Sequence, residues 1–297
     1  MAEKPLVPTQ GDTERARAVG ALLTAARRLI EVGDLRWEEV QEDHRLLVVN
    51  YVMRRQLESL EAALKLASEN LGHLSVAFVR AALEEMLWVR FLASLKVETS
   101  QRLLLAMANY DGLRSLLAQR GYVGDDVMAS LWYPVEFLDA AERKLVSVKE
   151  DLKQLRAELG WRGTLPSGDW VAESVNEAPL YEYLHSATSR ALHFSVGEIF
   201  RRGWGNPKGI LVTDKSEFRE HLSEFALDRL WRLLFETIAA ALPLLEASGI
   251  TSSDQLTDEV MMPLLDEVRR LGNVPLVHAA EWNLTPQGPL KSPQTEF

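Results

Sequence analysis

Arg80 and Glu84 are the first residues whose types and spacing could do chemistry. Side chains four residues apart lie on the same face of an α-helix, so the two can pair or act on one ligand. The residues around them, from 74 to 92, are apolar nearly all round the helix, which is typical of a buried element. A buried charge is costly unless it is paired, so we expect both residues to bind each other or a neighbouring helix.

A second group of polar side chains follows one side of a predicted helix over residues 179–202. Its members recur at intervals of four residues: Tyr181, His185, Ser189 and His193. Arg190 flanks this stripe, and Ser195 lies beyond it. Because histidine titrates near neutral pH, the stripe offers two groups that can give or take a proton.

If the two helices pack together, their polar side chains converge on one site. The residues expected there as acid, base or charge-stabilising groups are Arg80, Glu84, Arg190 and His193. The residues expected to contact a substrate are Tyr181, His185, Ser189 and Ser195. Such a site could cleave a phosphodiester without a metal, with His193 as general acid or base and the arginines stabilising the phosphoryl charge. The alternative is a hydrogen-bonded network that fixes helix register, and we favour it because buried polar groups are normally satisfied for structural reasons.

A metal site is a weaker interpretation of the same stripe. His185 and His193 are eight residues apart, whereas paired ligands on a helix favour spacings of three or four. The chain contains no cysteine, which excludes thiolate zinc sites and disulfides. We therefore expect no metal and no cofactor.

The elements that position these residues are helices, because apolar patterns of period 3.6 recur nearly throughout the chain. They predict an all-α fold, a multi-helix bundle of seven to nine helices with no significant sheet. We expect them over residues 12–31, 36–70, 73–95, 99–120, 125–159 with a bend at Pro134, 179–202, 216–247 and 252–271. Residues 1–272 would form one domain with a main loop at 160–179 and a short helix near 169–175. Residues 273–297 would form an extended or partly disordered tail.

Composition limits the classes of partner. The 297 residues are 47% hydrophobic and carry a formal charge of -10, which argues against a dedicated binder of duplex DNA. A local basic pocket for RNA or a nucleotide is still compatible with that balance. No segment approaches the roughly 20 apolar residues of a membrane span, and the N-terminus lacks a secretory signal, so we expect no membrane association and a cytoplasmic location.

The segments V-R-A-A-L-E-E-M-L-W and L-P-S-G-D-W-V-A, with the polar stripe that follows them, resemble a family of bacterial all-helical proteins of unknown function, some of which occur near defence genes. The family pattern is R-x-x-x-E on one helix and Y-x-x-x-Y-x-x-L-S-x-x-x-H-x-S on another. The matching residues are Arg80, Glu84, Tyr181, Ser189, His193 and Ser195. His185 and Thr188 stand where tyrosine and leucine are usual, and the resemblance covers roughly residues 75–202.

That family is distantly similar to the HEPN nucleases, whose mark is an arginine followed four to six residues later by a histidine. Arg190 and His193 are separated by only two residues, so the mark itself is absent. We expect a helical interaction or regulatory protein of a bacterial, defence-associated system, acting as a homodimer or on a protein partner. Long amphipathic helices at 36–70 and 216–247 could supply the interface. The alternative is a metal-independent ribonuclease, or a protein that binds nucleotide or phosphate, at the same polar site.

Overall fold

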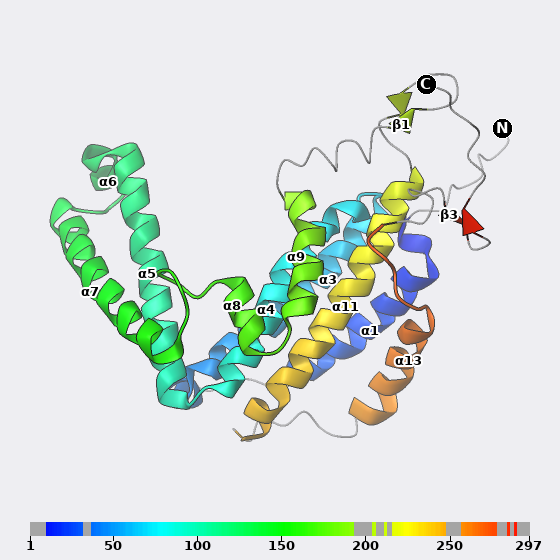
Figure 1. The fold of residues 1–297 in the computed structure, drawn as a ribbon, viewed down its shortest axis with the longest axis horizontal. Coiled ribbons are helices and arrows are strands. Elements are labelled where there is room, and N and C mark those ends of the chain that lie inside the picture. The colour runs from blue at the N-terminus through cyan, green and yellow to red at the C-terminus, as the bar shows by residue number, and fades with distance from the viewer. Residues whose placement is uncertain are drawn as a thin grey trace.

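The computed structural model describes residues 10–31, 37–192, 204–205, 211–212, 216–247, 257–277, 284–285 and 288–289. Within these ranges the chain forms eleven α-helices, and the expected all-α class is confirmed (Figure 1). The β-structure described is limited to two antiparallel pairs of two-residue strands, β1 (Trp204–Gly205) with β2 (Leu211–Val212) and β3 (Leu284–Thr285) with β4 (Gly288–Pro289).

The α-helices range in length from six to 32 residues. They are α1 (Glu14–Glu31), α2 (Trp37–Glu42), α3 (His44–Ser68), α4 (Val76–Ser94), α5 (Val97–Val123), α6 (Asp125–Ser130), α7 (Val135–Leu159), α8 (Gly168–Ser174), α9 (Ala178–Leu192), α11 (Ser216–Ala247) and α13 (Met262–Arg270). Two 3₁₀ turns, η1 (Gln10–Asp12) and η2 (Gly72–Ser75), and a π-helical turn, η3 (Thr257–Met261), complete the set.

The core of the body is organised around α11. This helix packs against α4, α3, α1 and η2, and Figure 1 shows it between the α3–α4–α9 side and the α1–α13 side. Phe225 and Leu234 of α11 and Leu83 of α4 are fully buried there. The burial of large side chains such as these stabilises the fold by about 1.5–3 kcal/mol each.

Helices α5, α6 and α7 form an arm that projects from this body (Figure 1). Helices α5 and α7 lie side by side, with Leu103 at the base of α5 and Val148 of α7 in the common core. Farther out, from 117 to 141, no apolar side chain belongs to that core. The arm tip therefore rests only on its own small buried set, Met128, Leu138 and Ala141.

Two of the predicted helices are each two helices in the structure, which is why the count exceeds seven to nine. The prediction over 36–70 is wrong at Asp43, whose carboxylate accepts a hydrogen bond from the Arg45 backbone N–H at 2.9 Å and so starts a new helix. The prediction over 125–159 treated Pro134 as a bend. The chain instead reverses there, because the residue before a proline avoids helical backbone and α7 starts afresh after it.

Other boundaries differ by smaller amounts. Helix α5 continues past Gly121 to Val123 and is capped by Gly124, whose φ of +84° only glycine adopts without strain. The loop 160–179 carries α8 where a short helix was expected, and Trp161 is buried against the body. Helix α9 is described as far as Leu192.

The first residues after 272 attach to the body. The Val274 backbone N–H donates to Asp228 Oδ2 at 3.4 Å, and Arg229 Nη2 donates to the Val274 carbonyl at 3.1 Å. Residues 273–277 therefore continue the packed part of the chain beyond the predicted domain boundary. Of the rest of the predicted tail, the structure describes only β3 and β4.

Candidate functional site

Helices α4 and α9 do pack side by side, and α8 lies against both. This contact brings three of the predicted residues together. Arg80 Nε donates to Glu84 Oε1 at 3.0 Å on the same helix, and Arg80 Nη1 donates across to Ser189 Oγ at 3.0 Å on α9. The Ser189 hydroxyl in turn donates to the His185 carbonyl at 2.7 Å. Arg80 thus joins the two helices through a chain of hydrogen bonds.

Tyr181 lies next to this network and closes a small cavity. The cavity measures about 190 Å³, and its lining includes Arg80, Glu84, Trp88 and Gly168. Burial raises the pKa of Tyr181 above its usual 10, and the nearby Glu84 carboxylate adds to the rise. Tyr181 is therefore a neutral hydroxyl donor at ordinary pH.

Gly168, at the start of α8, makes room for Tyr181. A Cβ at this position would lie 2.7 Å from the Tyr181 hydroxyl oxygen and 2.9 Å from the ring. Real side chains do not approach so closely, so the tyrosine could not keep its place beside any residue but glycine. The segment L-P-S-G-D-W-V-A does not by itself predict this role for its glycine, because the tyrosine that needs the space lies 13 residues farther along the chain.

Tyr181 also lines a second cavity, of about 340 Å³. His185 stacks on the Tyr181 ring with 4.9 Å between ring centroids. The acidic side chains that line the cavity are Asp169, Glu173 and Glu182. A hydrogen bond from Ser167 lowers the pKa of Asp169, with smaller contributions from the Trp170 backbone and the His185 ring. The surroundings of Tyr181 thus carry more carboxylates than cations among the described side chains.

The predicted site residues fall into two groups. Arg80, Glu84, Tyr181, His185 and Ser189 lie together at the α4–α9 contact. The side chain of Arg190 and the whole of His193 and Ser195 lie outside the described residues.

A second polar cluster, which sequence reasoning missed, surrounds Asp228 of α11. Arg15 of α1 donates from Nη1 to Asp228 Oδ1 at 3.1 Å and from Nε to Glu224 Oε2 at 2.9 Å. Its Nη2 donates to the carbonyls of Leu271 and Gly272, at 3.1 Å each. Every guanidinium nitrogen of Arg15 thus bonds within the protein, so this cluster clamps three elements together.

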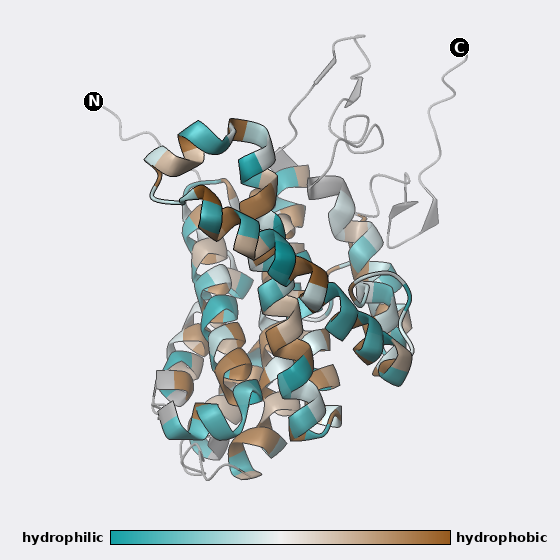
Figure 2. Ribbon diagram, turned by 90° about the vertical axis from the view of Figure 1, so that its left-hand side faces the viewer, coloured by the Kyte–Doolittle hydropathy of each residue, from teal (hydrophilic) through white to brown (hydrophobic). Residues whose placement is uncertain are grey.

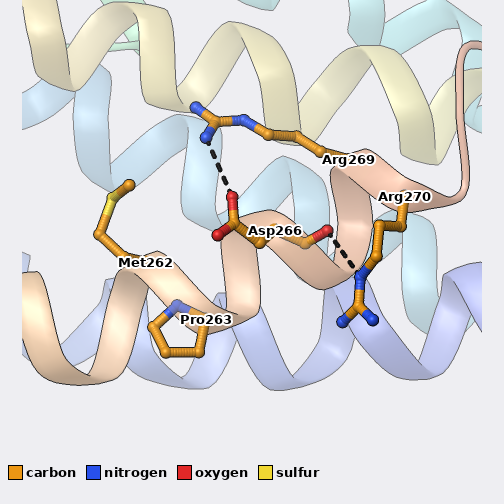
Figure 3. Close-up of a pocket in the computed structure, with 5 residues that line it drawn as sticks. All are labelled: Met262, Pro263, Asp266, Arg269 and Arg270. Atoms are coloured by element: carbon orange, nitrogen blue, oxygen red, sulfur yellow. Dashed lines mark hydrogen bonds and ion pairs between the residues drawn. The ribbon is translucent and has the colours of Figure 1, made fainter.

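The surface of α13 carries a further hollow, of about 800 Å³, shown in Figure 3. Its described lining residues all belong to that one helix: Met262, Pro263, Asp266, Arg269 and Arg270. Both arginines bond back to Asp266, Arg269 through the carboxylate at 3.4 Å and Arg270 through the carbonyl at 3.3 Å (Figure 3). The groups do not converge from different elements, so the hollow has the character of an open helix surface.

Comparison with protein-family models, curated proteins and solved structures finds no match to this chain. Within the described ranges, no three histidine or carboxylate side chains are grouped closely enough to hold a metal ion. In the same ranges, no helix is both long and apolar enough to cross a membrane.

Proposed function

We propose that this chain is an interaction protein and that the α5–α7 arm is its binding element. The observation that carries the proposal is Trp132, at the arm tip between α6 and α7. Its side chain is 94% exposed, and its backbone has a φ of +71°. The left-handed backbone costs free energy, and the described part of the fold leaves the ring in water.

The backbone at Trp132 explains the cost. The Tyr133 N–H donates to the Met128 carbonyl at 3.1 Å and the Trp132 N–H to the Ala129 carbonyl at 3.2 Å. This is a Schellman motif, in which the residue after the helix adopts a left-handed conformation that is usually filled by glycine and sometimes by asparagine. Asn70 and Asn176 fill the equivalent positions after α3 and α8. A tryptophan there is strained, and such outliers are typical of functional positions.

Exposed apolar side chains gather around Trp132. Of 17 large hydrophobic residues that are exposed in the described ranges, seven fall within the 16 residues at the arm tip: Tyr122, Val127, Leu131, Trp132, Tyr133, Val135 and Phe137. Figure 2 views the molecule from the arm's side, and hydrophobic positions lie among hydrophilic ones along the helices that face the viewer. Tryptophan and tyrosine are enriched among the residues that contribute most to protein–protein binding.

The test is to compare the parent with Trp132→Gly in native host cells, with Tyr51→Ala of α3 as a control that removes an exposed aromatic elsewhere. A protein that co-purifies with the parent and with the control, but not with Trp132→Gly, is then purified and titrated against all three. We expect a loss of affinity of about tenfold or more for Trp132→Gly, as for a central interface residue. Equal affinity for all three proteins would contradict the proposal.

The polar residues at the α4–α9 contact fit this role as a network that fixes the body beneath the arm. Arg80 is paired with both Glu84 and Ser189, as expected for a structural group. The resemblance of this region to helical proteins found near defence genes supports placing the interaction in a bacterial defence or regulatory system. That placement rests on the motif residues alone.

A second candidate function, binding of nucleotide or phosphate with or without RNA cleavage, is supported by the cavity beside Arg80 and Tyr181. It ranks second because the neighbouring carboxylates oppose an anion. The test is to titrate the parent and Arg80→Gln with nucleotides and an RNA oligonucleotide, with Arg55→Gln on α3 as control. Binding or cleavage that Arg80→Gln alone abolishes would support this function, and a parent that does neither would contradict it.

A further inference from the structure

The outer surface of α7 near the arm tip carries an exposed stripe of charged and uncharged side chains. The residues of this stripe lie within about 60° of Ala140 when successive residues are placed 100° apart around the helix axis. They are Glu136, Phe137, Ala140, Arg143, Lys144 and Ser147, and each is exposed. The acid and the aromatic ring precede Ala140, and the two bases follow it.

This order makes the stripe complementary to itself. If a second copy of α7 crosses antiparallel, with a twofold axis at Ala140, residues before the alanine face residues after it. Glu136 of one copy then lies opposite Arg143 of the other, and Phe137 lies opposite Lys144. The first pair is an ion pair, and the second joins an aromatic face to a cation and its aliphatic stem. Each contact occurs twice, as twofold symmetry requires.

The side chains of the stripe are available for such contacts. Arg120, on the α5 side of the tip, is already paired, with Asp125 at 2.7 Å and Asp139 at 3.0 Å. Glu136 and Arg143 form no ion pair with any other residue in the described part of the chain. The small side chain of Ala140, at the crossing point, lets the two backbones approach closely.

The same arrangement brings the arm tips to the two ends of the contact. Trp132 and Tyr133 lie just before Pro134, which caps the start of α7. In an antiparallel crossing at Ala140, the start of one α7 lies beside the turn that follows Lys144 in the other. In that turn Val146 is 68% exposed, about 120° round the helix from Ala140.

We infer that two copies of this chain bind each other through an antiparallel contact of their α7 helices, with the arm tips packed at its two ends. This inference rests on the proposed role of the arm in binding and names a second copy as the partner. The contact needs no rearrangement of the body, because the arm projects clear of it (Figure 1).

The charge pattern allows a test by reversal and mixing, using the purified full-length protein and sedimentation velocity over a concentration series. Glu136→Arg puts two arginines face to face in the pair, and Arg143→Glu puts two glutamates face to face. Each variant alone should associate at least tenfold more weakly than the parent. An equimolar mixture of the two should regain the parent's association, because each mixed pair forms one ion pair as in the parent and one with the charges exchanged. Pairing within one helix cannot explain such a rescue, since the two substitutions are on different chains.

Lys149→Glu is the matched control, because it makes the same change of charge on the opposite side of α7. It should associate like the parent, and circular dichroism should show that all the variants are folded. A parent that stays monomeric up to about 100 µM, a control that weakens as much as the stripe variants, or a mixture that does not recover would each overturn the inference. If the parent is monomeric but Trp132→Gly loses a foreign protein partner, the second copy is excluded and the proposed function stands.

Discussion

Asp228 shows how a single buried carboxylate can hold several elements together. It is 0% exposed, and it accepts hydrogen bonds from Arg15 of α1, from Arg232 one turn along α11, and from the Val274 backbone. A buried charge is tolerated when opposite charges and donors surround it, and the loss of one partner leaves the others unpaired in a medium that solvates them poorly.

Asp228→Ala should therefore lower the free energy of unfolding by about 3–5 kcal/mol, measured by urea denaturation. Arg102→Ala is the control, since Arg102 and Glu158 form an ion pair at 3.0 Å with side chains that are 53% and 43% exposed. Exposed pairs contribute little, so the control should lose less than about 1 kcal/mol. Similar losses in the two variants would show that the Asp228 cluster is not the clamp described.

Gly168→Ala tests the packing beside the candidate site. The added methyl group would collide with the Tyr181 ring and hydroxyl, and we expect a loss of about 1–3 kcal/mol in the free energy of unfolding. In a Tyr181→Ala background the same change should cost far less, because the obstacle is gone. Gly112→Ala, in α5 with nothing within 4 Å of the new atom, should instead gain about 0.5–1 kcal/mol. A Gly168→Ala variant as stable as the parent would contradict the geometry.

Two carboxyl groups should give pH dependences of opposite sign. Burial raises the pKa of Glu85 above its ordinary 4.5, so the stability it contributes is full below that value and is lost as the pH rises through the raised pKa. The free energy of unfolding of Glu85→Gln should then rise relative to that of the parent as the pH increases from acid to neutral. The Ser167 hydrogen bond lowers the pKa of Asp169 below 3.8, so its contribution is present above that value and is lost in acid.

Asp169→Asn should therefore lose stability against the parent at neutral pH, and the difference should close in acid. Urea unfolding of the parent and the two variants at a series of pH values measures both effects. Differences of the same sign for the two variants would be inconsistent with the two environments.

The sequence predicted which charged residues belong to the site, but it did not predict which residues they contact on other elements. Arg80 and Glu84 stood out because two charges interrupt an apolar helix, and the structure pairs them at 3.0 Å. The same reasoning would have flagged Asp228, which follows Phe225 and Ala226 in a buried stretch. Its partner Arg15 lies 213 residues away in the chain, and helical periodicity holds no information about which helices meet.

At the scale of the helix, the ends decide the path of the chain. Three helices finish with the same capping motif, and in two of them asparagine takes the left-handed position, as sequence rules lead one to expect. The reversal after α6 escaped prediction because Trp132 takes that position, against local preference. The arm was therefore not predicted, because a continuous helix over residues 125–159 contains no reversal that could form a tip.

Trp132→Gly should raise the free energy of unfolding by about 1–2 kcal/mol, because glycine adopts the left-handed conformation without the penalty and the lost side chain was exposed. Asn70→Gly and Asn176→Gly should change stability less, since asparagine tolerates that conformation. The measurement is urea denaturation at concentrations where the parent is monomeric. A destabilised Trp132→Gly would mean that the tryptophan is packed within its own chain.

At the scale of the whole molecule, the residues that form the common core and the residues of the proposed binding surface lie in different parts of the structure. The body holds the common core around α11, and the outer arm contributes no apolar residue to that core between 117 and 141. The all-α class followed from periodicity, which depends only on local sequence. The projection of the arm depends on which helices remain uncovered, a property of the assembled fold that no single segment encodes.

The most direct test of the binding role of the arm replaces residues 117–141 with a Gly-Ser turn of about five residues, long enough to join neighbouring helices. Thermal unfolding and sedimentation velocity are then compared with those of the parent. We expect the shortened protein to stay folded, to unfold at a similar temperature where both proteins are monomeric, and no longer to self-associate. A shortened protein that fails to fold, or one that associates as strongly as the parent, would contradict the claim that the arm exists for binding.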